Sequence, residues 1–209
     1  MEGYRTDEEQ IEHLKKWWNE NGKAVIGGLI IGLAAVYGWR GWQTHLIEQG
    51  KAASDIYQNM TEEVRQNKKD SAREYANNLL TDYSSTTYAT FAAFMLAKLD
   101  AENKNPASAI NHLQWILENE NEQALSHIAR LRIARLLLAQ NKPLQSLEIL
   151  NVGNPGKFIS SYEELRGDSY LMQGNTEAAK KSYEQALINQ KTSANEQSII
   201  QMKLDDMGH

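Results

Sequence analysis

The five histidines are the side chains of this sequence best suited to bind a metal or to act as a general base near neutral pH. They are His13, His45, His112, His127 and His209. No two of them are spaced as H-x-x-x-H or H-E-x-x-H, the spacings that place two ligands on one face of a helix. Each is therefore interpreted as a solvated helix residue, and no metal site is predicted.

Other catalytic patterns are also missing from the sequence. The chain has no cysteine, which excludes disulfides, thiolate metal sites and cysteine nucleophiles. It has no P-loop, no G-x-S-x-G and no dinucleotide fingerprint, and the pair Gly27–Gly28 lies inside an apolar run where it cannot cradle a phosphate. The acidic residues are dispersed along predicted helices and indicate solvated faces. The sequence predicts no enzyme activity and no cofactor.

Composition indicates a folded, all-helical protein. Of 209 residues, 41% are hydrophobic and 23% charged, as in ordinary globular domains. Ala, Leu, Gln, Glu and Lys are frequent, only three prolines occur, and runs typical of strands are absent. The net charge of −5, without a basic stripe, argues against a nucleic-acid partner.

An apolar run near the N-terminus predicts a membrane-spanning helix over residues 24–42. From Ala24 to Trp39 it reads AVIGGLIIGLAAVYGW, with no charge between Lys23 and Arg40. A span needs about 20 apolar residues, and this run is slightly short. Lys23 and Arg40 compensate, because their stems can lie in lipid while their charges reach the headgroups. Tryptophans flank both ends, as an aromatic belt would place them: Trp17, Trp18, Trp39 and Trp42.

Two other interpretations fit the run less well. A cleaved signal peptide would begin with a short basic segment, whereas about 23 residues including Asp7, Glu8, Glu9, Glu12 and Glu20 precede the run. A buried helix of a soluble core would tolerate its glycines poorly, since each costs about 1 kcal/mol in a soluble helix. Membrane helices carry glycine commonly.

Basic residues set the expected orientation. Arg5, Lys15, Lys16 and Lys23 precede the run, while Arg40 and Lys51 follow it. The positive-inside rule then predicts a cytoplasmic tail (1–23), a span (24–42) and a domain across the membrane (43–209). In a Gram-negative bacterium this is a single-pass inner-membrane protein with a periplasmic domain.

Small residues inside the run could also form a helix-packing face. Gly28 and Gly32 make a G-x-x-x-G pattern, with Ala35 one turn further on. Such spacing lets a second helix approach closely. The alternative is that glycine is simply frequent in membrane helices.

The soluble part carries a tetratricopeptide-like pattern. Its clearest unit is LRGDSYLMQGNTEAAKKSYEQALINQ, Leu165–Gln190. Here a small residue at Gly167 lets two helices approach, Tyr170 and Tyr183 fill the space between them, and Gly174 permits the turn. The small residues Ala179 and Ala186 complete the pattern.

Weaker copies of this unit precede it. Thirty-three residues earlier stand Ala134, Leu137, Asn141, Ser146 and Leu150, and further back Ala97, Ala109, Leu113 and Ile116 surround the turn ENKNPAS. These copies predict three or four helical hairpins stacked as a solenoid, which presents a concave surface to a peptide or protein. A capping helix, Ala194–Met207, is expected to turn Ile199, Ile200 and Leu204 inward.

The flanks of the apolar run resemble a known family. The segments are Glu20-Asn21-Gly22-Lys23 and Gly38-Trp39-Arg40-x-Trp42, followed in order by Ala53-Ser54, Tyr57-Gln58-Asn59, Leu165-Arg166-Gly167-Asp168 and Gln201-Met202-Lys203. This order is similar to that of the ancillary SecYEG translocon subunits, tetratricopeptide-containing inner-membrane proteins of proteobacteria.

The resemblance implies a function without catalysis. It implies association with the SecYEG translocon and with the membrane-anchored foldase PpiD. It also implies contact with membrane lipid and with nascent or unfolded envelope proteins, whose folding or trafficking the protein would assist as a scaffold or chaperone partner. An alternative function is a membrane-tethered regulator that sequesters an envelope-stress signalling protein.

Overall fold

The computed structural model describes residues 7–189 and 194–207. Its helices are α1 (Asp7–Arg65), α2 (Lys69–Asp82), α3 (Thr87–Glu102), α4 (Pro106–Asn119), α5 (Gln123–Ala139), α6 (Pro143–Ile149), the 3₁₀ turn η1 (Gly156–Phe158), α7 (Ile159–Met172), α8 (Thr176–Ile188) and α9 (Ala194–Asp205). The structure is 85% helical, with no strand in the described part of the chain. This confirms the all-α class and the long apolar N-terminal helix followed by tetratricopeptide-like repeats.

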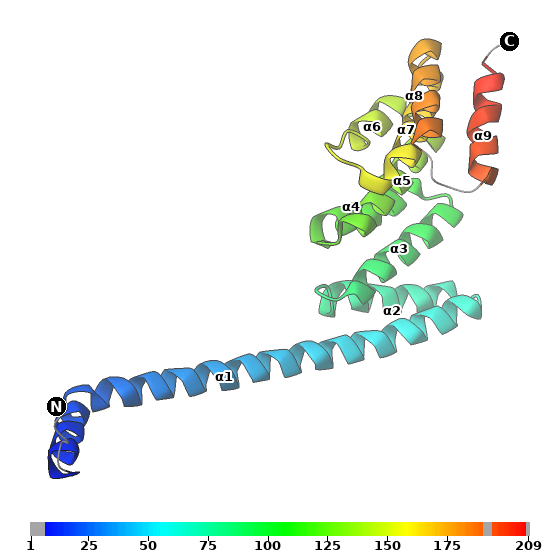
Figure 1. Cartoon of the computed structure of the whole chain (residues 1–209). Coiled ribbons are helices and arrows are strands. Elements are labelled where there is room, and N and C mark those ends of the chain that lie inside the picture. The colour runs from blue at the N-terminus through cyan, green and yellow to red at the C-terminus, as the bar shows by residue number, and fades with distance from the viewer. Residues whose placement is uncertain (1–6, 190–193, 208–209) are drawn as a thin grey trace, which may run out of the picture. The chain divides into compact units, whose positions relative to one another are not determined.

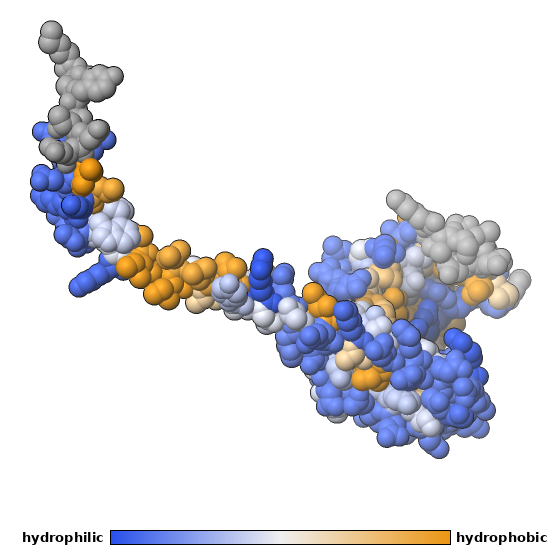
Figure 2. Space-filling view, turned by 90° about the horizontal axis from the view of Figure 1, so that it is seen from below, coloured by the Kyte–Doolittle hydropathy of each residue, from blue (hydrophilic) through white to orange (hydrophobic). Residues whose placement is uncertain are grey.

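The chain divides into two units between Lys51 and Ala52, within α1. The first unit is the N-terminal part of α1, a helix whose apolar side chains face outward. Leu29, Ile31 and Tyr37 are 64%, 71% and 70% exposed. Figure 2 shows hydrophobic surface, in orange, gathered along the middle of this helix. By length and composition, α1 is the one helix in the described residues that could cross a membrane.

The second unit consists of consecutive helical hairpins (Figure 1). The end of α1, residues 52–65, pairs with α2, and the pairs α3–α4, α5–α6 and α7–α8 follow before α9. Each helix from α2 to α9 packs against the next along the chain. The described residues thus contain four hairpins, at the upper end of the predicted number.

The turns inside the four hairpins share one geometry. Each contains a residue in the left-handed region: Asn67 (φ 58°), Lys104 (57°), Asn141 (58°) and Gly174 (76°). In each turn the next residue donates its N–H to a carbonyl five residues earlier, as from Asn175 to Tyr170 at 3.0 Å. This is the Schellman arrangement that ends helices. The following helix starts at once, and the Asn105 and Asn175 side chains accept the N–H groups of Ser108 and Ala178 as caps.

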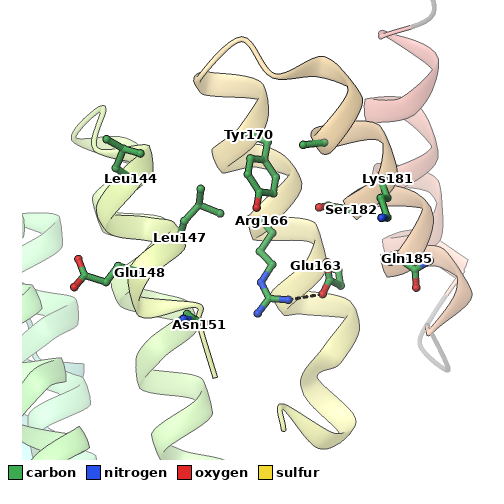
Figure 3. A pocket seen from close by; sticks show the side chains of 11 residues that line it. Leu144, Leu147, Glu148, Asn151, Glu163, Arg166, Tyr170, Lys181, Ser182 and Gln185 are labelled. Atoms are coloured by element: carbon green, nitrogen blue, oxygen red, sulfur yellow. Dashed lines mark hydrogen bonds and ion pairs between the residues drawn. The ribbon is translucent and has the colours of Figure 1, made fainter. Parts of the chain in front are cut away.

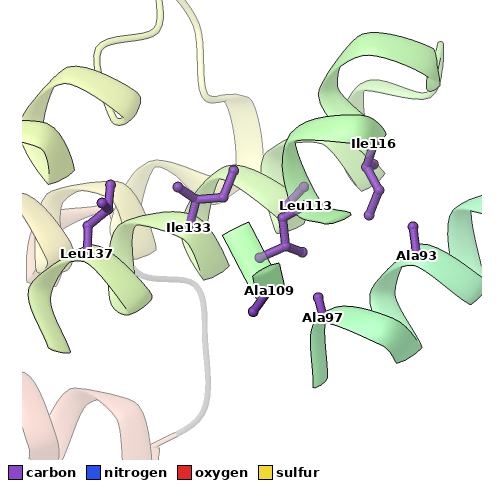
Figure 4. Close-up of a cluster of buried hydrophobic side chains, with 8 residues drawn as sticks. Ala93, Ala97, Ala109, Leu113, Ile116, Ile133 and Leu137 are labelled. Carbon is purple, nitrogen blue, oxygen red and sulfur yellow. The ribbon is translucent and has the colours of Figure 1, made fainter. Parts of the chain in front are cut away.

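Alanines at the helix contacts form the core of the repeats. In the central cluster, Ala93, Ala97 and Ala109 are at most 4% exposed and lie beside Leu113, Ile116, Ile133 and Leu137 (Figure 4). A methyl side chain keeps helix axes close, while the leucines and isoleucines fill the remaining space. Five positions picked out by the repeat pattern therefore lie in this cluster between helices: Ala97, Ala109, Leu113, Ile116 and Leu137.

The C-terminal helix differs in one residue from its prediction. Ile200 is 2% exposed and belongs to the buried cluster with Ala179, Tyr183 and Ala186, against which Leu204 packs, as expected of a capping helix. Ile199 is 47% exposed, so the prediction that it turns inward is wrong. Neighbouring residues of a helix lie about 100° apart, and the narrow face of α9 that is covered accommodates Ile200.

Candidate membrane anchor and repeat groove

The residues predicted for the span all lie on the outside of α1. Ala24, Gly28, Gly32, Ala35 and Trp39 are exposed, as are the flanking Lys23, Arg40 and Trp42. The rings of Trp39 and Trp42 lie 5.2 Å apart at one end of the apolar segment. A Cβ atom added at Gly28 or Gly32 would meet nothing within 4 Å. This face is open, so lipid or another helix can reach the backbone closely.

Gly167 of α7 lies directly against Tyr183 of α8. Tyr183 is fully buried, with its ring directly over Gly167. A Cβ atom at Gly167 would lie 2.5 Å from Tyr183 Cδ1 and 2.9 Å from Cζ, both shorter than a carbon–carbon contact allows. Ala179 and Ala186, also fully buried, lie in the cluster with Tyr183. Glycine at position 167 is therefore required by the tyrosine that packs on it.

A polar network extends from this contact to α9. The Tyr183 hydroxyl donates to Asp168 Oδ1 at 2.7 Å. Lys203 of α9 donates to the same oxygen at 2.7 Å and to Glu164 Oε1 at 2.8 Å. The sequence did not predict this network, because Lys203 is 35 residues from Asp168 and 39 from Glu164, and these residues follow no local pattern.

Burial and charge perturb both donors of the network. Burial, together with the Asp168 hydrogen bond and the nearby acidic charges, raises the pKa of Tyr183. Burial alone would lower the pKa of Lys203, but its hydrogen bonds to Asp168 and Glu164 and their charges outweigh that and raise the pKa. Lys203 thus remains cationic and fastens α9 to α7.

Gly174 lies away from the Gly167 contact, whereas Tyr170 packs against the buried cluster of Ala179, Tyr183, Ala186 and Ile200. Gly174 is the exposed left-handed residue of the turn between α7 and α8. Tyr170 is partly buried and lines an open groove of about 870 Å³ between α6, α7 and α8. Figure 3 shows Tyr170 and Arg166 projecting from α7 between the other two helices. The groove residues are Leu144, Leu147, Glu148, Asn151, Glu163, Arg166, Tyr170, Ala178, Lys181, Ser182 and Gln185.

The groove combines a fixed floor with exposed walls. Arg166 is held by Glu163 Oε1 at 2.6 Å and by the Leu150 carbonyl at 2.8 Å. On the walls, Leu144 is 71% exposed and Lys181 is exposed. A similar groove of about 520 Å³ lies between α4, α5 and α6. Both grooves are lined by apolar and polar side chains together.

Two histidines have structural roles, which corrects their interpretation as solvated residues. His112 Nε2 lies 3.3 Å from Oδ2 of the buried Asp100. The Asp100 carboxylate also accepts a hydrogen bond from the Ser108 hydroxyl at 2.6 Å and forms an ion pair with Arg73 at 2.6 Å. This carboxylate links α2, α3 and α4. Burial, then the Arg73 charge, lower the pKa of His112 against the opposing effect of Asp100.

The second of these histidines, His127, packs among aromatic rings of the next repeat. Its Nδ1 lies 2.8 Å from the Tyr162 hydroxyl and its ring centroid 5.2 Å from that of Phe158. Burial and the Arg130 charge lower the pKa of His127. His13 and His45 are exposed, and His209 lies outside the described residues. Within 7–189 and 194–207 no three acidic or histidine side chains gather as a metal site.

The sequence is similar to that of known proteins along almost its whole length. Residues 15–209 match the family described as "Tetratricopeptide repeat-like domain". A protein of Aggregatibacter actinomycetemcomitans named "Ancillary SecYEG translocon subunit" is 32% identical over 96% of this chain and 97% of its own. A protein of the same name from Haemophilus influenzae is 32% identical over 96% of this chain and 97% of its own. Another, from Escherichia coli K12, is 28% identical over 99% of both chains.

No solved structure matches the chain significantly. The family is therefore established by sequence, and the helical hairpins, their repeated turns and the long apolar N-terminal helix agree with it. The chain belongs to the family of ancillary SecYEG translocon subunits.

Proposed function

We propose that the chain is a non-enzymatic membrane-anchored subunit that works beside the SecYEG translocon. In this role it assists secreted and envelope proteins as they leave the channel into the periplasm. The observation that supports the proposal most is the combination, in one chain, of an open apolar helix and a repeat domain, matched end to end by relatives of that name.

The proposed topology follows from the charges beside the span. Residues 1–23 form the cytoplasmic tail, 24–42 cross the inner membrane once, and 43–209 form the periplasmic domain. The excess of Lys and Arg before the span supports this orientation. The open face at Gly28 and Gly32 is then available inside the bilayer to a helix of the translocon or of the foldase PpiD, as well as to lipid.

The groove between α6, α7 and α8 is the proposed binding site for an emerging polypeptide. Its exposed Leu144 and partly buried Tyr170 offer apolar contacts, and Lys181 and Glu148 offer charges of both signs. A mixed surface of this kind accepts varied sequences at modest affinity. Anchoring in the membrane compensates, since it raises the concentration of the groove near the channel exit.

Co-purification tests the proposal directly. The full chain is solubilised in mild detergent and captured by a C-terminal tag, and SecY and PpiD are quantified in the eluate. The matched control carries an unrelated apolar helix of equal length in place of residues 24–42. We expect SecY and PpiD to be enriched severalfold with the natural chain relative to the control in which residues 24–42 are replaced. Equal recovery with a tagged, unrelated single-span protein would refute the translocon association.

The tail before the span favours a second candidate function, that of a membrane-tethered regulator. About 23 residues precede the span on the proposed cytoplasmic side, so a signalling protein could be held there. Deleting the residues before Lys15 should then change an envelope-stress reporter while secretion stays normal. An unchanged reporter would eliminate this candidate.

A further inference from the structure

We infer that residues 9–22 of α1 form an amphipathic helix that lies on the membrane surface, within the lipid headgroup layer, just before the span. The inference goes beyond the proposed function and depends only on the anchoring of α1. It starts from four large apolar side chains of this segment. Ile11, Leu14, Trp17 and Trp18 are 53%, 67%, 50% and 50% exposed.

These side chains share one face of the helix. At 100° per residue, Trp17, Leu14, Trp18 and Ile11 fall within an arc of about 120°, which they share with the uncharged Gln10 and Asn21. The opposite side is hydrophilic throughout, with Glu9, Glu12, His13, Lys16 and Glu20. An apolar stripe with tryptophan and a hydrophilic, mostly charged opposite face is typical of helices that lie in a membrane interface.

Continuity with the span identifies lipid as the occupant of this face. Leu14 precedes Ala24 by ten residues, so a helical rise of 1.5 Å per residue keeps it within about 15 Å of the bilayer. Indole rings favour this depth, because they combine a large apolar surface with a hydrogen-bond donor. Within 9–22, Lys15 and Lys16 stand against Glu9, Glu12 and Glu20, a net charge of only −1, so charge gives this segment little attraction to a macromolecule. Tethering by the span removes the need for strong intrinsic affinity.

A change of direction is needed between a helix in the membrane plane and one that crosses it. The sequence supplies a weak point at Asn21 and Gly22. The Asn21 side-chain amide donates to the Trp17 carbonyl at 3.1 Å, the acceptor that the helix backbone uses for Asn21. Gly22 is buried beneath the Trp18 indole, where a Cβ atom would lie 3.2 Å from Cε2. In Figure 1 the first turns of α1 run at an angle to the remaining helix.

Single spin labels test the inference, and the cysteine-free sequence makes each label unique. Leu14→Cys and Glu12→Cys place the label on the apolar and the hydrophilic face, and Ile31→Cys places it in the span. The full chain is reconstituted in nanodiscs of phosphatidylethanolamine and phosphatidylglycerol. Collision rates with oxygen, which partitions into lipid, and with a nickel chelate, which stays in water, are then measured by electron paramagnetic resonance.

We expect a severalfold higher oxygen-to-nickel ratio at position 14 than at position 12. Replacing Trp17 and Trp18 by Gln should lower the ratio at position 14 and leave position 31 unchanged. Equal ratios at 12 and 14, with position 31 lipid-like, would overturn the inference while the anchor stands. Shielding of position 14 from both reagents would also overturn it, because a protein surface would then cover the face. A water-like position 31 would refute the anchor itself.

Discussion

Replacing Gly167 by alanine should destabilise the repeat domain, although Gly→Ala usually stabilises a helix. The new Cβ would lie 2.5 Å from Tyr183 Cδ1, about 1 Å closer than van der Waals contact. The ring cannot move freely, because it is fully buried and its hydroxyl is bonded to Asp168 at 2.7 Å. Either α7 and α8 must move apart, or the Tyr183 ring must leave its buried position and break its hydrogen bond to Asp168.

The magnitude follows from opposing contributions. Overpacking a core costs about 1–3 kcal/mol, and weakening a hydrogen bond to a charged group costs up to about 1.5–3 kcal/mol more. The helix gains about 1 kcal/mol when glycine becomes alanine. We expect a net loss of roughly 2–3 kcal/mol. For a chain of this size that lowers the melting temperature by roughly 5–10 °C.

Thermal unfolding of the full chain in detergent, followed by circular dichroism, measures this loss. Gly50→Ala is the matched control, because Gly50 is also helical and its Cβ would meet nothing within 4 Å. In the double variant Gly167→Ala/Tyr183→Leu the smaller side chain relieves the clash, so its destabilisation should be less than the sum of the single variants. A Gly167→Ala variant as stable as the natural chain, or more so, would refute the packing argument.

Three further predictions concern turns, pH and the C-terminal helix. Lys104→Gly should stabilise the chain by about 0.5–1 kcal/mol in denaturant titrations, because Lys104 has φ 57° and glycine adopts this conformation without strain. The control Lys98→Gly, within α3, should instead destabilise it by about 1 kcal/mol. A change of the same sign in both variants would contradict this prediction. Since the pKa of His112 is lowered in the folded chain, the unfolded chain binds the proton first, and stability should fall as pH drops below 6.5. His112→Gln should reduce that slope in unfolding midpoints, and an unchanged slope would count against it. Lys203→Met should speed hydrogen exchange in α9 at neutral pH. Because the pKa of Lys203 is raised above 10.5, the stability that its ion pairs contribute is present below pH 10.5 and is lost as the pH rises above it. Unchanged exchange at neutral pH would show that the ion pairs do not hold the helix.

The sequence was sufficient for the fold class and for much of the repeat. Gly167, Tyr183 and Gly174 follow a local pattern with a direct physical cause, either a close helix contact or a left-handed turn. The same reasoning reached Asn141, whose φ of 58° places it at the equivalent turn. Local spacing is informative here because each hairpin is formed by residues close together in the chain.

Contacts between distant parts of the chain were not predictable in this way. The ion pairs of Lys203 span α7 and α9, and Asp100 joins side chains from α2 and α4. His112 was misread for this reason: its sequence neighbours suggest a solvated helix, while its environment comes from another helix. Ile199 was misread because hydrophobicity alone does not distinguish adjacent residues at the edge of a helix face.

Photo-crosslinking in living cells tests the proposed role at the translocon most directly. A photoreactive amino acid is placed at Leu144 on the wall of the α6–α8 groove, and at Leu46, exposed on α1, as a position outside the groove. A secretory protein arrested in the channel supplies the polypeptide. We predict that position 144 crosslinks to the arrested chain or to a subunit of the channel, and that the crosslink disappears when residues 24–42 are replaced by an unrelated span. Absence of both products at position 144, with normal expression and membrane insertion, would contradict the proposed function.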